Sequence, residues 1–261
     1  MFDPTEAPGP SFTDVLRRVG LDPFLPIAGS AQTAPFEIRH GTTIVALRYA
    51  DGVVMAGDRR ATAGSSIAHR AMDKVHPADR HSGVAIAGAA GPAMERVKLF
   101  QLQLEHYEKV EGSALSLEGK ANQLSQMVRS NLGMAMQGFV VVPLFAGFDV
   151  RRGVGRIYSY DPTGGRYEET DFHADGSGGR DARTTVKLGW RPDLARDEAV
   201  ELAVRALWNA ADEDSATGGP DAVRGIYPTV ATITSGGFEY LATEEVAERF
   251  AAVVSSGESL S

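Results

Sequence analysis

The sequence predicts an α+β fold in which antiparallel sheets carry helices on their outer faces. Apolar and β-branched runs come in pairs joined by short turns rich in glycine and aspartate, which is typical of hairpins. Segments with helical periodicity also come in pairs, instead of alternating with single strands. This order favours antiparallel sheets covered by helices over alternating βαβ units. The chain has no recognisable internal repeat, and no domain boundary after Thr42.

The first strands form a hairpin. Residues 43–49 and 53–56 are apolar runs, and residues 50–52 between them end in the Asp-Gly dipeptide that hairpin turns favour. A further apolar run predicts a strand at residues 83–88.

Two helices and two strands follow. Proline suits the first turn of a helix, so a helix is predicted to begin at Gly91-Pro92. Apolar residues recur at three- and four-residue steps over 93–107 and again over 117–132, which predicts two helices with one apolar face each. Residues 139–148 and 155–160 resume the strand pattern.

The last part of the chain repeats these patterns. Residues 161–165 are dense in turn formers and are predicted to lead, as a hairpin, into a strand at 166–172. Residues 197–211 are apolar nearly all round, which predicts a buried helix. The other predicted elements are a helix from just past Ser177 to Leu188, a hairpin of strands 228–234 and 238–241, and a short helix from Thr243.

Composition limits the possible functions. With 261 residues, 43% of them hydrophobic, the chain is long enough to bury one sizeable core. The net charge of −8 argues against nucleic acid or a membrane surface as a partner and favours other proteins. The absence of cysteine excludes disulfides, a thiol nucleophile and a thiolate metal site, and is compatible with a reducing compartment. No apolar run has the length needed to cross a bilayer.

Residues 1–40 differ from the rest in composition. They hold six prolines, carry acidic residues near the start, and lack the basic end and apolar block of a secretory signal. Two interpretations are open: a flexible tail, or a removable leader that keeps the Thr42 amine acylated until the protein is assembled.

The residues after this segment favour the removable leader. Gly41-Thr42-Thr43 stands at the head of an apolar strand. If the Gly41–Thr42 bond is cut, Thr42 carries nucleophile and base together, because its hydroxyl attacks while its own α-amine takes the proton. A threonine inside the chain has no such amine.

Each of the other candidate site residues, taken singly, has two interpretations. Asp58, at the end of the second strand, is either a turn former or a buried carboxylate, and Lys74 is either a surface charge or a partner drawn inward. If the two pair, the lysine charge lies beside the Thr42 hydroxyl and favours its alkoxide. Gly88 either packs tightly against a helix or leaves its N–H free for an oxyanion. The glycine clusters at 176–179 and 214–219 lack the spacing of a phosphate-binding loop.

Taken in order, these motifs resemble the catalytic β subunits of the proteasome core particle, especially the actinobacterial type, within the N-terminal nucleophile hydrolases. The resemblance covers the chain from Gly41 to the final helix. Its motifs are G-T-T-I-V-A-L at 41–47, V-V-M-A-G-D-R-R at 53–60, D-K-V at 73–75, I-A-G-A-A at 86–90, G-S-G at 176–178 and D-x-x-T-G-G at 214–219.

The resemblance implies a four-layer αββα sandwich of two antiparallel sheets packed face to face. It divides the chain into a propeptide, residues 1–41, which removes itself by cleavage at Gly41, and a catalytic domain, residues 42–261. It also assigns roles to residues. Thr42 is the nucleophile, Lys74 held by Asp58 tunes it, Ser177 and Asp214 orient its amine and hydroxyl, and Thr217 stands where the family usually has serine.

The resemblance further implies how a peptide is held, with no metal or cofactor. The Gly88 N–H is the oxyanion donor, and the backbones of Thr62, Gly88 and Ala90 bind substrate as an added strand. The side-chain pocket beside the scissile bond is lined by Ala61, Met72, Ile86, Ala90 and Met94. These residues are apolar, so we expect a preference for apolar side chains over charged ones.

The implied assembly is a cytoplasmic barrel. Seven β subunits form each of two inner rings, α subunits form the outer rings in the order α7β7β7α7, and an ATPase ring feeds unfolded protein into it. Two alternatives remain. A two-ring bacterial threonine peptidase shares the threonine start but has a shorter chain and a minimal leader. A non-catalytic structural ring subunit has no use for Gly41-Thr42, Asp58 and Lys74 together.

Overall fold

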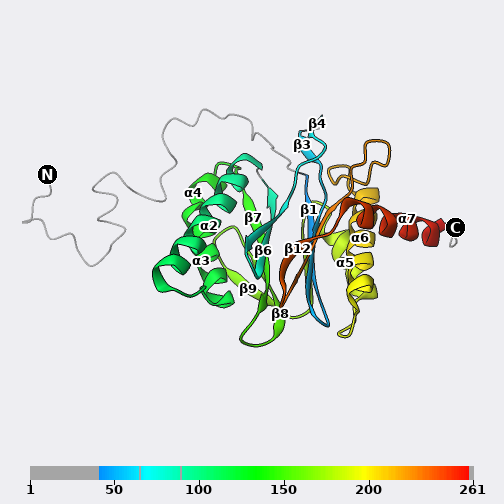
Figure 1. Cartoon of the computed structure of the whole chain (residues 1–261). Helices are drawn as coiled ribbons and strands as arrows, with labels where there is room; N and C mark the ends of the chain where they lie inside the picture. The colour runs from blue at the N-terminus through cyan, green and yellow to red at the C-terminus, as the bar shows by residue number, and fades with distance from the viewer. Residues whose placement is uncertain (1–40, 65, 89, 259–261) are drawn as a thin grey trace, which may run out of the picture. The chain divides into compact units, whose positions relative to one another are not determined.

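Two five-stranded antiparallel sheets make up the centre of the protein, and helices cover their outer faces (Figure 1). The computed structural model describes residues 41–64, 66–88 and 90–258, so the predicted leader at 1–40 lies outside the described residues. The predicted α+β sandwich with antiparallel sheets is confirmed.

The first sheet has the strand order β10-β1-β2-β11-β12. Its strands are β1 (Thr43–Tyr49), β2 (Gly52–Gly57), β10 (Phe172–Gly176), β11 (Thr229–Thr234) and β12 (Gly237–Tyr240). The predicted hairpin of β1 and β2 is confirmed, with Tyr49 opposite Gly52. On its other side β1 pairs with β10, and Thr43 lies opposite Gly176. The strand that begins one residue after Thr42 is therefore an interior strand of the sheet.

The second sheet has the order β5-β6-β7-β8-β9. Its strands are β5 (Val75–Asp79), β6 (Ser82–Gly88), β7 (Val141–Asp149), β8 (Val154–Tyr160) and β9 (Arg166–Glu169). A separate short ribbon is formed by β3 (Ala61–Ala63) and β4 (Ser66–His69).

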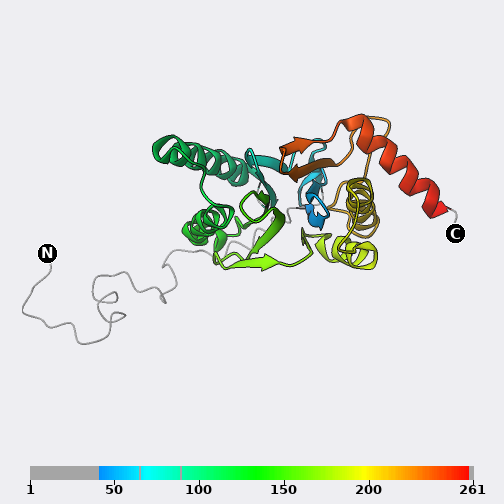
Figure 2. The ribbon, with the colours of Figure 1, turned by 60° about the horizontal axis from the view of Figure 1, so that its bottom comes forward.

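The helices lie in two groups. Helices α2 (Ala90–Glu111), α3 (Leu117–Ser130) and α4 (Leu132–Ala135) belong to the second sheet, and α5 (Gly179–Gly189), α6 (Arg196–Glu213) and α7 (Thr243–Glu258) to the first. Figure 2 shows the green α2 and α3 on one side of the strands and the yellow α5 and α6 on the other. None of the helices within the described ranges has the length and hydropathy needed to cross a bilayer.

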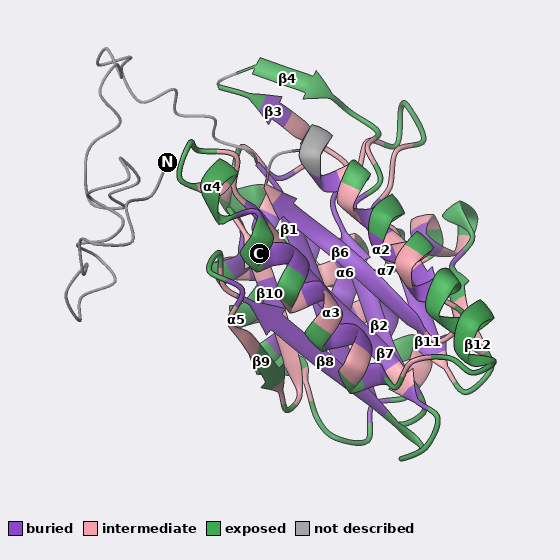
Figure 3. Ribbon diagram, turned by 90° about the vertical axis from the view of Figure 1, so that its left-hand side faces the viewer, coloured by how far each residue is buried: buried purple, intermediate pink, exposed green. Residues whose placement is uncertain are grey.

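Side-chain alternation along β1 explains the layers. Ile44 and Ala46 face the second sheet, whereas Val45 and Leu47 pack against α5 and α6. Because both faces of this strand are covered, it reads in the sequence as a continuous apolar run. Figure 3 shows the same effect across the central strands, which are buried, while much of the β3–β4 ribbon is exposed.

One predicted element is wrong. Residues 166–172 do not form a single strand, because the chain bends at Thr170 and Asp171 and passes from one sheet to the other. The segment before the bend, β9, pairs with β8, whereas β10 after it pairs with β1. The connection is therefore a crossover between layers.

Strands β3, β4 and β5 were not predicted. β5 contains Pro77, and its pairing with β6 is irregular between Pro77 and Asp79. Proline lacks the N–H of a ladder hydrogen bond and is tolerated in edge strands, which is the position of β5. The apolar periodicity that marks an interior strand is accordingly weak there.

Candidate active site

Thr42 is buried directly before β1, with 4% of its surface exposed. Its backbone is bound to the turn after β10, because the Ser177 N–H donates to the Thr42 carbonyl at 2.8 Å. The Thr42 N–H in turn donates to Ser177 Oγ at 3.3 Å. Gly176 lies beside this pair with a φ of +97°, and a Cβ there would come within 1.9 Å of the Thr42 carbonyl oxygen. Only glycine allows this close approach.

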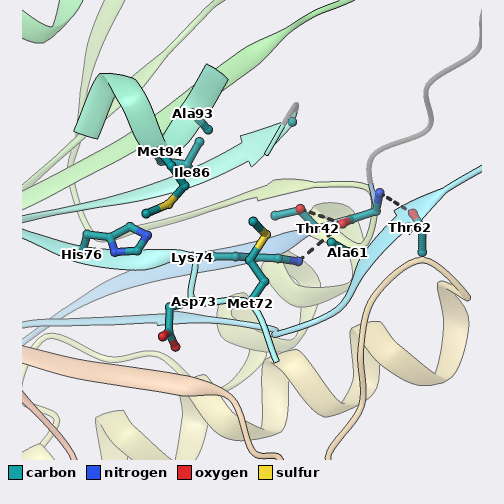
Figure 4. Close-up of a pocket in the computed structure, with 12 residues that line it drawn as sticks. Thr42, Ala61, Thr62, Met72, Asp73, Lys74, His76, Ile86, Ala93 and Met94 are labelled. Carbon is teal, nitrogen blue, oxygen red and sulfur yellow. Dashed lines mark hydrogen bonds between the residues drawn. The ribbon is translucent and has the colours of Figure 1, made fainter. Parts of the chain in front are cut away.

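The side chain of Thr42 points back to the preceding residue. Its hydroxyl donates to the Gly41 carbonyl oxygen at 2.7 Å, and the ammonium of Lys74 donates to the same oxygen at 3.4 Å (Figure 4). A hydroxyl and a cation thus meet at one carbonyl. The Gly41 N–H donates to Thr62 Oγ1 at 3.0 Å, which fixes the peptide from its other side.

Asp58 and Lys74 form a buried ion pair. Lys74 Nζ lies 2.5 Å from Asp58 Oδ1, and also donates to the Arg60 carbonyl at 2.6 Å. The carboxylate accepts three backbone N–H bonds besides, from Thr43, Arg60 and Gly218. Burial lowers the pKa of Lys74 below its ordinary value, although the Asp58 charge opposes the shift.

A second polar network centres on Asp214 and contacts Thr42 through Ser177. Ser177 Oγ and Thr217 Oγ1 both donate to Asp214 Oδ2, the latter at 2.6 Å. Burial by itself raises the pKa of Asp214, but the hydrogen bonds from Ser177 and Thr217 outweigh it and the pKa lies below its ordinary value. The carboxylate is therefore held in its charged form, and the Ser177 hydroxyl joins it to the Thr42 nitrogen.

Thr43 joins this network and was missed by the sequence reasoning. Its hydroxyl oxygen lies 2.6 Å from Thr217 Oγ1 and accepts the Gly178 N–H at 3.1 Å. Since Thr217 donates to Asp214, the hydrogen bonds form a chain from Gly178 through Thr43 and Thr217 to that carboxylate. The doubled threonine was the available signal, but only the first of the two was given a role.

A cavity opens beside Thr42 and Lys74 (Figure 4). Six residues predicted to bind substrate or an oxyanion line it: Ala61, Thr62, Met72, Ile86, Gly88 and Met94. Ala90, the remaining one, is the first residue of α2 and is not among the lining residues, and its side chain lies outside what the structure describes. Ala93, on the same helix, lines the cavity.

Gly88 has a backbone conformation that favours glycine. Its φ is +114°, and a Cβ at this position would come within 2.1 Å of the Val140 carbonyl oxygen. The position therefore requires glycine, and the bare backbone forms part of the cavity wall.

Asp73 and His76 line the same cavity and were also missed. Both belong to the segment around the unpredicted strand β5, so no register was available to place them. The signal was the two-residue step from Lys74 to His76, which puts both side chains on one face of an extended segment. Burial lowers the pKa of His76, with the Asp73 carboxylate opposing the shift.

The architecture and the place of Thr42 at the head of an interior strand agree with the fold of the N-terminal nucleophile hydrolases. A family model described as proteasome subunit matches residues 38–224. The chain is 61% identical to the proteasome subunit beta of Acidimicrobium ferrooxidans over 238 residues, which are 91% of this chain and 86% of the relative. It is 61% identical to that of Streptomyces griseus over 212 residues, covering 81% and 75% of the two chains. For Jonesia denitrificans the identity is 52% over 242 residues, covering 92% and 80%. The chain belongs to the proteasome subunit family, among its β subunits.

Proposed function

We propose that this chain is an N-terminal threonine endopeptidase, the proteolytic β subunit of a barrel-shaped core that degrades unfolded proteins. The observation that carries the proposal is the meeting of the Thr42 hydroxyl and the Lys74 ammonium at the Gly41 carbonyl oxygen. That carbonyl belongs to the peptide bond whose cleavage frees the Thr42 amine. Residues 1–41 are then a propeptide and residues 42–261 the mature domain.

Maturation uses the chain's own groups. Thr42 Oγ1 attacks the carbonyl carbon of Gly41, while Lys74 stabilises the charge that develops on the carbonyl oxygen. The C–N bond breaks, the acyl group passes to the hydroxyl oxygen as an ester, and the nitrogen leaves as the new α-amine with a proton. Water hydrolyses the ester, which releases residues 1–41 and restores the hydroxyl.

Peptide hydrolysis repeats this chemistry on a substrate. An unperturbed α-amine has a pKa of about 7.7–8.0, so the freed Thr42 amine is suited to act as base near neutral pH. Oγ1 attacks the substrate carbonyl, an acyl-enzyme ester forms, and water activated by the amine releases it. The mechanism uses no metal or cofactor.

The other residues position these groups. Ser177 contacts the Thr42 nitrogen and Asp214 holds Ser177, so the pair orients the amine. Thr217 supports Asp214 in the place of a serine. The Gly88 N–H serves as oxyanion donor, the backbones of Thr62, Gly88 and Ala90 hold the substrate strand, and the apolar cavity takes the side chain before the scissile bond.

The resemblance supports the wider setting of this activity. Seven such subunits form each inner ring of an α7β7β7α7 barrel in the cytoplasm, and an ATPase ring delivers unfolded proteins to it. A subunit with its reactive residue inside such a barrel needs no substrate-binding domain of its own.

The test is N-terminal sequencing and peptide hydrolysis with the assembled core of this chain and its α partner. We expect a mature chain that begins at Thr42 and hydrolyses fluorogenic peptides, whereas T42A keeps its leader and is inactive. A wild-type chain that assembles without cleavage before Thr42, and without peptidase activity, identifies a structural ring subunit instead. Rings of this chain alone that bind an ATPase identify the two-ring type.

A further inference from the structure

A second cavity of the protein, which we call the arginine cavity, is lined by Arg59, Arg60 and Arg70 and by residues of the loop before β11. It shares no lining residue with the cavity beside Thr42. Three arginines at one cavity contrast with the net charge of −8 that the chain carries as a whole. Positive charge around a concave surface concentrates the electric field there and attracts anions.

Backbone and side-chain hydrogen bonds build the first wall of the arginine cavity. Arg59 Nη2 donates to the Ala71 carbonyl at 3.1 Å, and the Met72 N–H donates to the Arg59 carbonyl at 2.9 Å. These two bonds hold the segment after β4 against the turn after β2. Arg70 is thereby brought to the same cavity as Arg59, although the two residues lie at opposite ends of the β3–β4 ribbon.

The second wall is the loop between α6 and β11, which Figure 1 shows in orange near the β3–β4 ribbon. Arg60 Nη1 donates to the Ser215 carbonyl of this loop at 2.9 Å. The N–H groups of Arg60 and Gly218 both donate to Asp58 Oδ2, at 2.9 and 2.8 Å. Both walls are therefore attached to the carboxylate that pairs with Lys74.

The protein neutralises these arginines only in part. In the part of the chain that the structure describes, Arg60 and Arg70 form no ion pair. Arg59 pairs with Asp73 at 3.2 Å, but the Asp73 side chain is 51% exposed, so solvent screens this pair. The arginine cavity therefore keeps a net positive charge that a bound anion would offset.

Two hydrogen-bond donors at the arginine cavity also lack an acceptor. Arg59 Nε is buried and has no hydrogen-bond partner among the described residues. The Gly219 N–H, next to the one that binds Asp58, makes no hydrogen bond within the described ranges either. Asp221 lines the cavity but is already bound by Arg224, whose Nη1 lies 2.6 Å from its carboxylate. Donors without acceptors are destabilising, so they favour a ligand that accepts.

We propose that the arginine cavity binds a phosphate group, either free or carried by a nucleotide. Guanidinium groups match the tetrahedral oxygens and the charge of phosphate, and each can donate two hydrogen bonds to it. The bound phosphate joins the turn at Arg59 and Arg60 to the loop at Gly218 and Gly219. Since both segments donate to Asp58, the phosphate stabilises the Asp58–Lys74 pair from outside the substrate cavity.

The test is titration calorimetry of inorganic phosphate into the assembled core of this chain with its α partner, at an ionic strength fixed with NaCl. We expect one phosphate site per β chain. R70Q removes a charge from an exposed side chain and should weaken binding at this site about 10-fold or more.

Two further variants define the site. R59K keeps the charge at this position but has no Nε donor, so it should weaken phosphate binding about 3- to 10-fold. R129Q is the matched control, because it removes one charge from an exposed arginine of α3 that does not line the cavity. It should keep the wild-type affinity.

The same titration with ADP distinguishes the two sources of phosphate. Binding of ADP that R70Q weakens identifies a nucleotide, whereas binding of inorganic phosphate alone identifies the free ion. No binding of either ligand, or equal affinities in R70Q and R129Q, overturns the proposal. Because the measurement needs no cleavage, its result is independent of the proposed peptidase function.

Hydrogen exchange tests the link to Asp58. Saturating phosphate should slow the exchange of the backbone amides in residues 58–60 and 217–219 of the wild-type core, and should have a much smaller effect in R70Q. Unchanged exchange of these amides in the wild-type core overturns the stabilisation of the Asp58–Lys74 pair by phosphate.

Discussion

The hydroxyl oxygens of Thr43 and Thr217 lie 2.6 Å apart inside the protein, although 174 positions separate the two residues in the chain. The contact joins the first residue of β1 to the loop that carries Asp214. Replacing Thr217 by valine should leave the Thr43 hydroxyl without an acceptor and remove one donor from Asp214. We expect T217V to lose about 1–3 kcal/mol of unfolding free energy, measured by urea denaturation at fixed protein concentration.

T217S is the control for this change. It keeps the hydroxyl and loses only a buried methyl, so the expected loss is about 1 kcal/mol. A loss in T217V no larger than that in T217S would show that the hydroxyl link to Thr43 contributes no more to stability than the buried methyl does.

Removing the charge of Asp58 should be much more damaging. D58N leaves the buried Lys74 ammonium without a counter-charge and turns an amide nitrogen toward groups that donate. We expect a loss of about 3–5 kcal/mol, seen as a lower midpoint of chemical denaturation. D73N is the matched control, because Asp73 is half exposed and its pair with Arg59 contributes about 1 kcal/mol or less. Equal midpoints of chemical denaturation for D58N and D73N would contradict the stabilising role of the buried Asp58 charge.

The lowered pKa of Asp214 makes stability depend on pH. Because the folded pKa lies below the ordinary value of 3.8, ionised Asp214 stabilises the folded state above pH 3.8, and this contribution is lost as pH falls through the folded pKa. The difference in unfolding free energy between wild type and D214N should therefore be constant near neutral pH and shrink in acid. Denaturation of both proteins over a pH series measures it.

S177A provides the control for this pH dependence. It removes a donor to Asp214, so the pKa of Asp214 rises toward its ordinary value; the contribution of the ionised carboxylate should be smaller, and its loss should be complete at a higher pH than in wild type. A difference between wild type and D214N that stays constant through the acid range would contradict the assignment.

Alanine at position 41 should block maturation. A Cβ on Gly41 would lie 2.3 Å from the Ala216 carbonyl oxygen and 2.2 Å from the Ala216 methyl, so the peptide before Thr42 would have to shift from the position in which it meets Lys74. We expect G41A to accumulate as precursor in intact-mass measurements. G133A is the control, because a Cβ there meets nothing within 4 Å. Processing of G41A at the wild-type rate would refute the close fit.

Local patterns predicted most of the fold. The runs that became β1, β2, β11 and β12 are apolar and bounded by turn residues. The periodic segments became α2 and α3, and the segment that is apolar nearly all round became α6. Each of these signals lies within a single helix or strand. The crossover at Thr170 and Asp171 has no such local signal, because the partner of each half lies in a different sheet.

The candidate site was predictable to the extent that motifs carry it. Asp58 and Lys74 were named from their motifs, and the structure brings them to 2.5 Å from each other. The places of Thr43 and His76 in the site could be seen only once the strands were paired into sheets. Thr43 meets Thr217 only through the closure of the fold, and His76 faces the cavity only through the register of β5, which proline and polar residues conceal.

The separations in sequence between the groups around Thr42 also determine the order in which these groups are synthesised. Ser177 lies 135 residues after Thr42, and Asp214 lies later still. A chain emerging from the ribosome therefore presents Thr42 long before Ser177 and Asp214 have been synthesised. On the proposed mechanism a nascent chain cannot cleave itself, and synthesis from the N-terminus delays the reaction until the whole domain is present.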